Sequence, residues 1–85
     1  MSADALTQIK EWLADEIENR KLLLSTMQST HADSVVLKEK QDTLSSYEQA
    51  AGSAGSEASF EAFLTSHTGS DKIAAIAKMW AGLKA

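Results

Sequence analysis

The apolar residues of the first third of the chain recur at the spacing of an α-helix. From about Ala3 to Gln28 they follow one another at intervals of three, four and seven residues, which places them on one helical face. That face consists of Leu6, Ile9, Leu13, Ile17, Leu24 and Met27. Trp12 and Leu23 flank it and widen it. Ser2 with Asp4 and Ala5 makes a suitable helix start, and the pattern predicts one long amphipathic helix.

A second apolar stripe follows a polar break. It extends from about Ala32 to Ala51 and consists of Val36, Leu37, Leu44, Tyr47 and Ala51. In one continuous straight helix it would lie roughly 150° around the axis from the first stripe, at about 100° per residue. The residues QSTHAD between the stripes compete for backbone hydrogen bonds, and Thr30 with Asp33 forms a weak capping pair. We therefore expect a helical hairpin, with one long bent helix as the alternative.

Small residues and glycines divide the second half of the chain. Residues 52–59 form a small-residue linker, and Gly52 is expected to end the second helix in a left-handed turn. A helix of about ten residues is then predicted by the spacing of Phe60, Phe63, Leu64 and His67. Gly69 should end it, and Ser70 should cap a final short helix.

These elements predict an all-α fold in one domain. A hairpin of two long helices over residues 1–51 is followed, after the linker, by two short helices over residues 60–85. A chain of 85 residues builds only a small core, and without cysteine it cannot form disulfides. Regular helix packing and self-association remain as sources of stability, including coiled-coil-like contacts between helices.

No catalytic or ligand-binding pattern is present in the sequence. The hydroxyl residues lie in no nucleophile motif, and neither His31 nor His67 has a second metal ligand at a suitable spacing. The carboxylates of Asp15, Glu16 and Glu18 are typical of a solvated helix face. The sequence therefore predicts a protein that is not an enzyme and that has no cofactor and no metal.

The charges argue against a general nucleic-acid binder, because the net charge is −4 and the basic residues are not clustered. The charge is uneven, since the chain from Lys72 onward contains three lysines and no acidic side chain. Two cations, Arg20 and Lys40, interrupt the apolar stripes. Each either sets the register of a helix interface or lies along an apolar surface with its charge in water.

Membrane insertion and export are not expected. The first residues contain no basic region followed by an apolar run, and the longest apolar run is five residues, Ile73 to Ala77. Three lysines spread around the last helix also argue against a helix lying on a membrane surface. The expectation is a soluble, cytoplasmic protein.

The last helix suggests how the protein acts. It has a broad apolar face, and its opposite side consists of small residues, so a second chain could approach it closely. We therefore expect a small non-enzymatic interaction or assembly module that forms homo-oligomers or docks on a larger protein or particle. The expected interface residues are Leu6, Trp12, Leu13, Leu24, Ile76, Trp80 and Leu83. The alternative is a nucleic-acid-binding regulator with a helix-turn-helix over residues 57–84.

Overall fold

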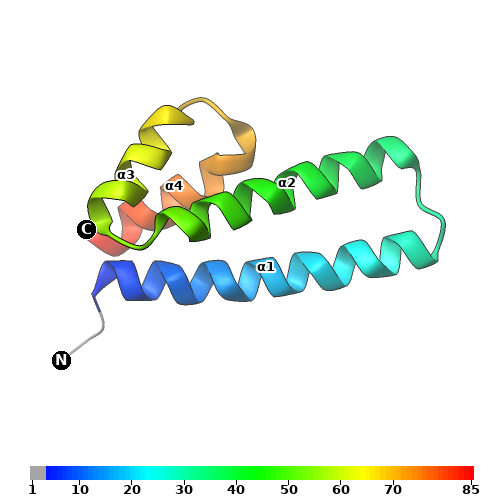
Figure 1. Ribbon diagram of the computed structural model, residues 1–85, viewed down its shortest axis with the longest axis horizontal. Helices are drawn as coiled ribbons and strands as arrows, with labels where there is room; N and C mark the ends of the chain where they lie inside the picture. Colours follow the sequence, from blue (N-terminus) through cyan, green and yellow to red (C-terminus); the bar gives the residue numbers. More distant parts are fainter. Residues whose placement is uncertain (1–3) are drawn as a thin grey trace.

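The computed structural model describes residues 4–85, and in this part of the chain it shows four α-helices and no strand. They are α1 (Ala5–Ser29), α2 (Ser34–Ser53), α3 (Glu57–Ser66) and α4 (Asp71–Lys84). The first two form a long antiparallel hairpin, and the last two pack over one end of it (Figure 1). The predicted all-α fold with a hairpin and two short helices is confirmed, and the single bent helix is excluded.

The polar break between the stripes forms the turn of the hairpin. Asp33 caps α2, because its carboxylate accepts a hydrogen bond from the Val35 N–H at 2.8 Å. Thr30 does not pair with Asp33; its hydroxyl donates back to two carbonyl oxygens of α1, each at 3.1 Å. His31 has φ of 55°, in the left-handed region, so it is the turn residue that the sequence predicts. At the start of α1, Asp4 is the N-cap, whereas Ser2 and Ala3 lie outside the described residues.

The connection between α2 and α3 is shorter than the predicted linker over residues 52–59. Gly52 lies inside α2, which continues to Ser53, so the left-handed turn expected at this glycine is wrong. Helix α3 starts early because Ser56 and Ser59 form a capping box three residues apart. The connection is also firmly packed, since Ala54 within it is fully buried. Gly69, with φ of 90°, makes the left-handed turn that separates α3 from α4.

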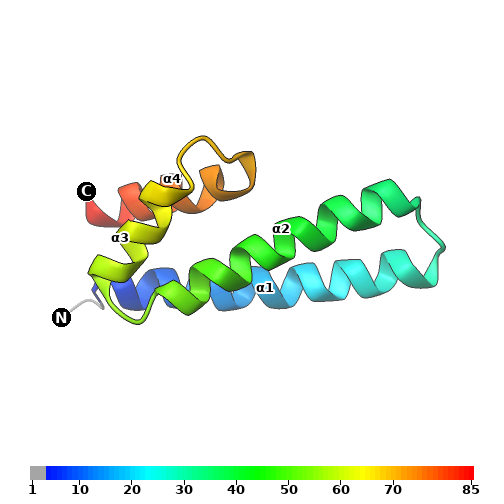
Figure 2. The ribbon, with the colours of Figure 1, turned by 45° about the horizontal axis from the view of Figure 1, so that its top comes forward.

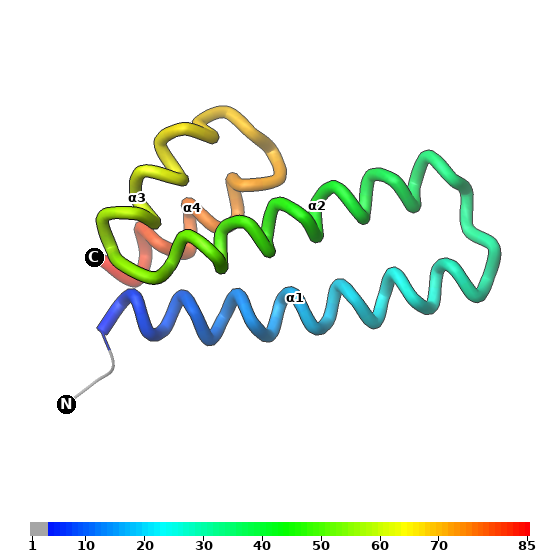
Figure 3. Tube along the Cα trace, in the orientation of Figure 1, coloured from blue at the N-terminus to red at the C-terminus, as the bar shows by residue number. Residues whose placement is uncertain are grey.

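The core lies at one end of the hairpin. Its buried residues are Ile9, Leu13, Tyr47, Ala50, Ala54, Phe60, Ile73, Ile76 and Trp80. Helix α4 contacts both α1 and α2, and α3 contacts α2. The rings of Phe60 and Trp80 meet edge to face, with centroids 5.0 Å apart. The tube in Figure 3 shows that α4 ends near the start of α1, and residues of both helix ends line one shallow pocket.

Arg20 marks the boundary of the core. Its Nη2 donates to the Tyr47 hydroxyl at 3.2 Å, and its guanidinium carbon lies 4.2 Å from the centroid of the Tyr47 ring. The same nitrogen lies 3.6 Å from a carboxylate oxygen of Glu16. Arg20 therefore joins α1 to α2 within the chain, whereas Lys40, the other interrupting cation, is exposed.

Candidate interaction surface

The predicted interface residues divide between the core and its edge. Three of them, Leu13, Ile76 and Trp80, are buried inside the chain's own core. The others are half-buried, and they are Leu6, Trp12, Leu24 and Leu83. The buried three cannot contact another molecule while the domain is folded. They belong to the single core that all four helices share.

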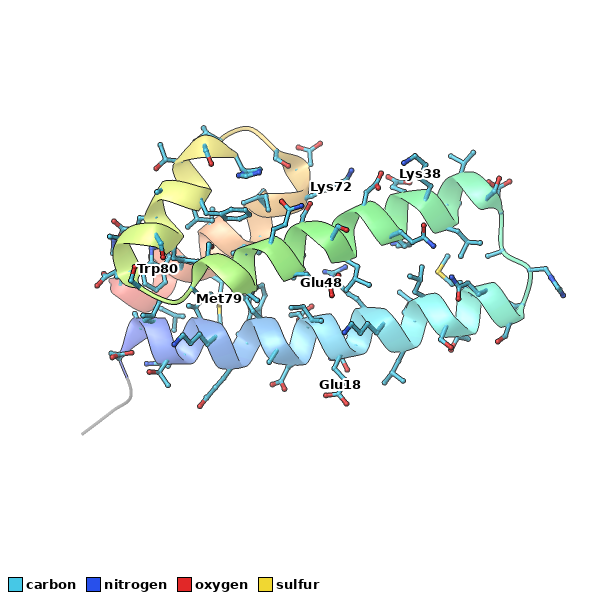
Figure 4. The ribbon with its side chains drawn as sticks, viewed as in Figure 1. Glu18, Lys38, Glu48, Lys72, Met79 and Trp80 are labelled. Carbon is cyan, nitrogen blue, oxygen red and sulfur yellow. The ribbon has the colours of Figure 1, made fainter. Side chains whose placement is uncertain are left out.

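The apolar face of α4 is covered by its own domain. Figure 4 shows Met79 close to α1, and the Trp80 ring packs on Phe60 of α3. Lys72 strengthens this contact electrostatically, since its Nζ lies 3.8 Å from a carboxylate oxygen of Asp42 in α2. The small back face of α4 remains exposed, with Ala74, Ala75 and Ala81.

The half of the hairpin beyond the core is the main exposed apolar surface. We call residues 22–41 the distal arm; it comprises eight residues of each helix, Leu22–Ser29 and Ser34–Gln41, and the turn between them. None of these residues is buried. In the part of the chain that the structure describes, all the exposed large hydrophobic side chains lie in the distal arm. They are Leu22, Leu23, Val35 and Val36, with exposed fractions of 63, 47, 72 and 39%.

Two of these side chains extend the hairpin face that α4 covers nearer the core. Leu23 follows Trp12 by eleven residues, close to three helical turns, and Trp12 lines a hollow together with α4. Val35 precedes Asp42, which pairs with α4, by seven residues, close to two turns. The end of α3 and the start of α4 lie near the middle of the hairpin, so this face is bare along the distal arm (Figure 2). We call it the open face and define it by Leu23, Val35 and Val36.

Two shallow hollows lie outside the open face. The larger, of about 590 Å³, lies between α1 and the end of α2, and its lining includes Ala14, Ile17 and Gly52. The smaller, of about 390 Å³, lies between Trp12 of α1 and Met79 and Leu83 of α4. Both are wide open to solvent and mainly apolar, and neither contains a group of side chains arranged for catalysis.

Charge distinguishes the distal arm from the rest of the chain. The arm contains two bases and two acids, which are Lys38, Lys40, Asp33 and Glu39, so its net charge is zero. The remaining residues contain six bases and ten acids, so the whole net charge of −4 lies outside the arm. Figure 4 shows one of these acids, Glu18, pointing away from α2, and Lys38 near the turn end of α2.

The ionisable groups with shifted pKa values stabilise helix ends or join helices. The hydrogen bond from Lys84, helped by its charge, lowers the pKa of Glu61 and correspondingly raises the pKa of Lys84. Trp80 Nε1 also donates to Glu61, at 3.4 Å. A hydrogen bond from the Thr7 backbone lowers the pKa of Asp4 at the start of α1. All three groups are exposed, so these shifts indicate structural contacts between α3 and α4 and at a helix start.

The described residues contain no cluster of three or more His, Cys, Asp or Glu side chains that could hold a metal ion. Over the same residues, no helix is both long and apolar enough to cross a membrane. Comparison of the chain with known protein families, with characterised proteins and with solved structures finds no match. The distal arm is therefore the candidate functional surface on the strength of its own geometry.

Proposed function

We propose that the protein is a small non-enzymatic interaction or assembly module that binds a protein partner through its distal arm. The observation that carries the proposal is the position of the large exposed hydrophobic residues, which, within residues 4–85, all lie in the arm and outside the core. A cluster of exposed apolar side chains on a small folded domain is typical of a binding surface, because burying it against a partner is favourable.

The way the arm is built supports this proposal. The core uses the other end of the hairpin, so the arm adds little buried area to the isolated domain. It is nevertheless regular, with a capped helix start at Asp33 and with Leu24, Met27 and Leu37 partly buried. Paired helices of this kind hold their side chains in fixed positions, which lowers the entropy lost on binding.

No observation favours the helix-turn-helix alternative over residues 57–84. Of the three lysines of α4, Lys72 pairs with Asp42 and Lys84 pairs with Glu61. Only Lys78 lacks an ion pair with a described residue, and one cation cannot supply the phosphate contacts that nucleic-acid binding needs.

Photo-crosslinking in the cells that produce the protein tests the proposal. A photoreactive amino acid replaces Val35 in the arm or, as the matched control, Ala62, which is exposed on α3. We expect a discrete crosslinked protein product from position 35 and none from position 62. The same products from both positions, or no product from position 35, would contradict a binding role for the arm.

A further inference from the structure

We infer that the partner of the open face is a second copy of this chain, bound through a two-fold axis so that the two distal arms form a four-helix bundle. This inference rests on the proposed function, since it assigns an occupant to the same surface. Two observations carry it. The open face, defined by Leu23, Val35 and Val36, is uncovered, and it lies directly beside the point where α3 ends and α4 begins.

The shape of the molecule is self-complementary. Helices α3 and α4 stand on one half of a hairpin face and leave the other half bare, which gives the chain the outline of a step (Figures 1 and 2). A second copy, rotated by 180° about a two-fold axis, places its own arm on the bare half. The second arm then continues the layer that α4 begins, and it covers the face with the same type of helix contact that α4 makes on α1 and α2.

The step also selects the orientation of the two-fold axis. An axis along the hairpin would bring the α3 and α4 helices of the two copies into collision, whereas an axis across the arm places them at opposite ends. With the axis across the arm, α1 packs antiparallel to its counterpart and α2 packs likewise. Leu23 is the second of the eight residues in the α1 part of the arm, Leu22–Ser29, about 4 Å along the helix from its midpoint. It therefore lies on the same face as Leu23 of the second copy and about 8 Å from it along the helices. Leu22, one residue away and about 100° around the helix, points away from that contact.

The charge distribution favours the same contact. Two copies that met through the acid-rich end would bring together surfaces that hold the entire net charge of −4 of each chain. The arm has two bases and two acids and no net charge, so two arms approach without that repulsion.

The contact area predicts how tight the dimer is. Eight residues along two adjacent helices cover about 12 by 20 Å, or about 240 Å² on each copy. Stable complexes bury about 800 Å² on each partner, so this interface is small. The turn of each copy also meets the α3–α4 connection of the other, which enlarges the contact. We therefore expect a weak, reversible dimer that requires high protein concentration.

The first experiment is sedimentation of the purified intact chain up to about 1 mM, the range that such a small interface requires. We expect a monomer–dimer equilibrium that reaches a plateau at the dimer. The double variant Leu23→Gln, Val35→Gln should weaken association at least about tenfold, because it places amides in the apolar contact. The control Leu22→Gln, at a more exposed leucine on the other side of α1, should change the association constant less than about threefold. Raising the salt concentration from about 50 to 500 mM should also change the association constant less than about threefold, since the arm has no net charge.

The second experiment uses the absence of cysteine from the chain. Single variants Leu23→Cys and Leu22→Cys are treated with a short bismaleimide reagent at the concentration where the dimer forms. A residue beside a two-fold axis is linked to itself, so Leu23→Cys should give covalent dimer at least about fivefold faster than Leu22→Cys. Equal rates for the two neighbours would overturn the assigned face.

Other results would overturn self-association itself. A chain that remains monomeric up to about 1 mM has no such dimer, and a series of larger species without a plateau indicates head-to-tail contacts. A monomer that instead binds vesicles of anionic phospholipid through Leu23 and Val35 would assign the open face to a membrane surface. If the purified chain is monomeric but Val35 crosslinks to a different protein in the cell, the dimer is wrong and the proposed function stands.

Discussion

Gly52 is a helix-weakening residue in the last turn of α2. Its φ is not in the left-handed region, and a Cβ at this position would meet no atom within 4 Å. Replacing Gly52 by Ala should therefore raise the free energy of unfolding by about 0.5 to 1 kcal/mol, since alanine restricts the unfolded chain and favours the helix. Chemical denaturation measures the change. Gly69→Ala is the control, and with φ of 90° it should destabilise the protein.

The contact between Arg20 and Tyr47 gives a second prediction for single residues. Tyr47→Phe keeps the buried ring under the guanidinium group and removes the hydroxyl that accepts its hydrogen bond. We expect a loss of about 0.5 to 1.5 kcal/mol in the free energy of unfolding, measured by denaturation. An unchanged value would mean that the ring contact and Glu16 hold Arg20 without the hydroxyl.

The turns and helix ends that short-range interactions determine could be predicted from the sequence. His31 in the turn and Gly69 at the end of α3 follow from short-range hydrogen bonds and backbone sterics, and the structure confirms them. The expected capping pair of Thr30 with Asp33 is wrong, because Asp33 caps α2 alone. Gly52 failed because a glycine that permits a left-handed turn does not require one. The nearby capping box of Ser56 and Ser59 decided where the next helix starts.

The element that depends most on one residue is α2. Asp33 supplies its cap at the tip of the arm, where no buried side chain holds the helix start in place. Asp33→Ala should cost about 1 kcal/mol and increase amide hydrogen exchange in the first turn of α2. Ser70→Ala at the start of α4 is the matched control, because the Ser70 side chain makes no capping hydrogen bond. Equal effects of the two substitutions would contradict this assignment.

Helix periodicity predicted the apolar face of each helix but could not say what covers it. The same pattern results whether a neighbour belongs to the chain or to another copy, since both exclude water from the face. Leu13, Ile76 and Trp80 were therefore expected at an interface and lie in the core. Val35 gave no sequence signal as a surface residue, because its exposure depends on where α4 begins.

For the whole molecule, the uneven placement of the core predicts two classes of mutational effect. Ile76→Ala at the centre of the core should cost about 2 to 5 kcal/mol, a large part of the total stability expected for such a small domain. Leu22→Ala in the distal arm should change the free energy of unfolding by no more than about 0.5 kcal/mol. Thermal or chemical denaturation of both variants measures the contrast. Similar losses at the two sites would show that the arm is part of the stabilising core.

The shifted pKa values predict how stability depends on pH. The pKa values of Asp4 and Glu61 are lowered in the folded chain, so their contribution is present above their ordinary values of 3.8 and 4.5 and is lost as the pH falls through the folded-state values. The pKa of Lys84 is raised, so its contribution is present below 10.5 and is lost as the pH rises through its folded-state value. The melting temperature should therefore fall at both extremes. Glu61→Gln should flatten the acidic limb.

The turn at residues 30–33 is far from every buried side chain, and this has a consequence for how such a chain can change in length. Seven residues inserted on each side of the turn, in matching helical phase, would extend the hairpin by about 10 Å. The contacts around Phe60, Ile76 and Trp80 would stay as they are. The reach of the protein is thus set by a segment that its folding hardly uses, so span and stability can be altered separately.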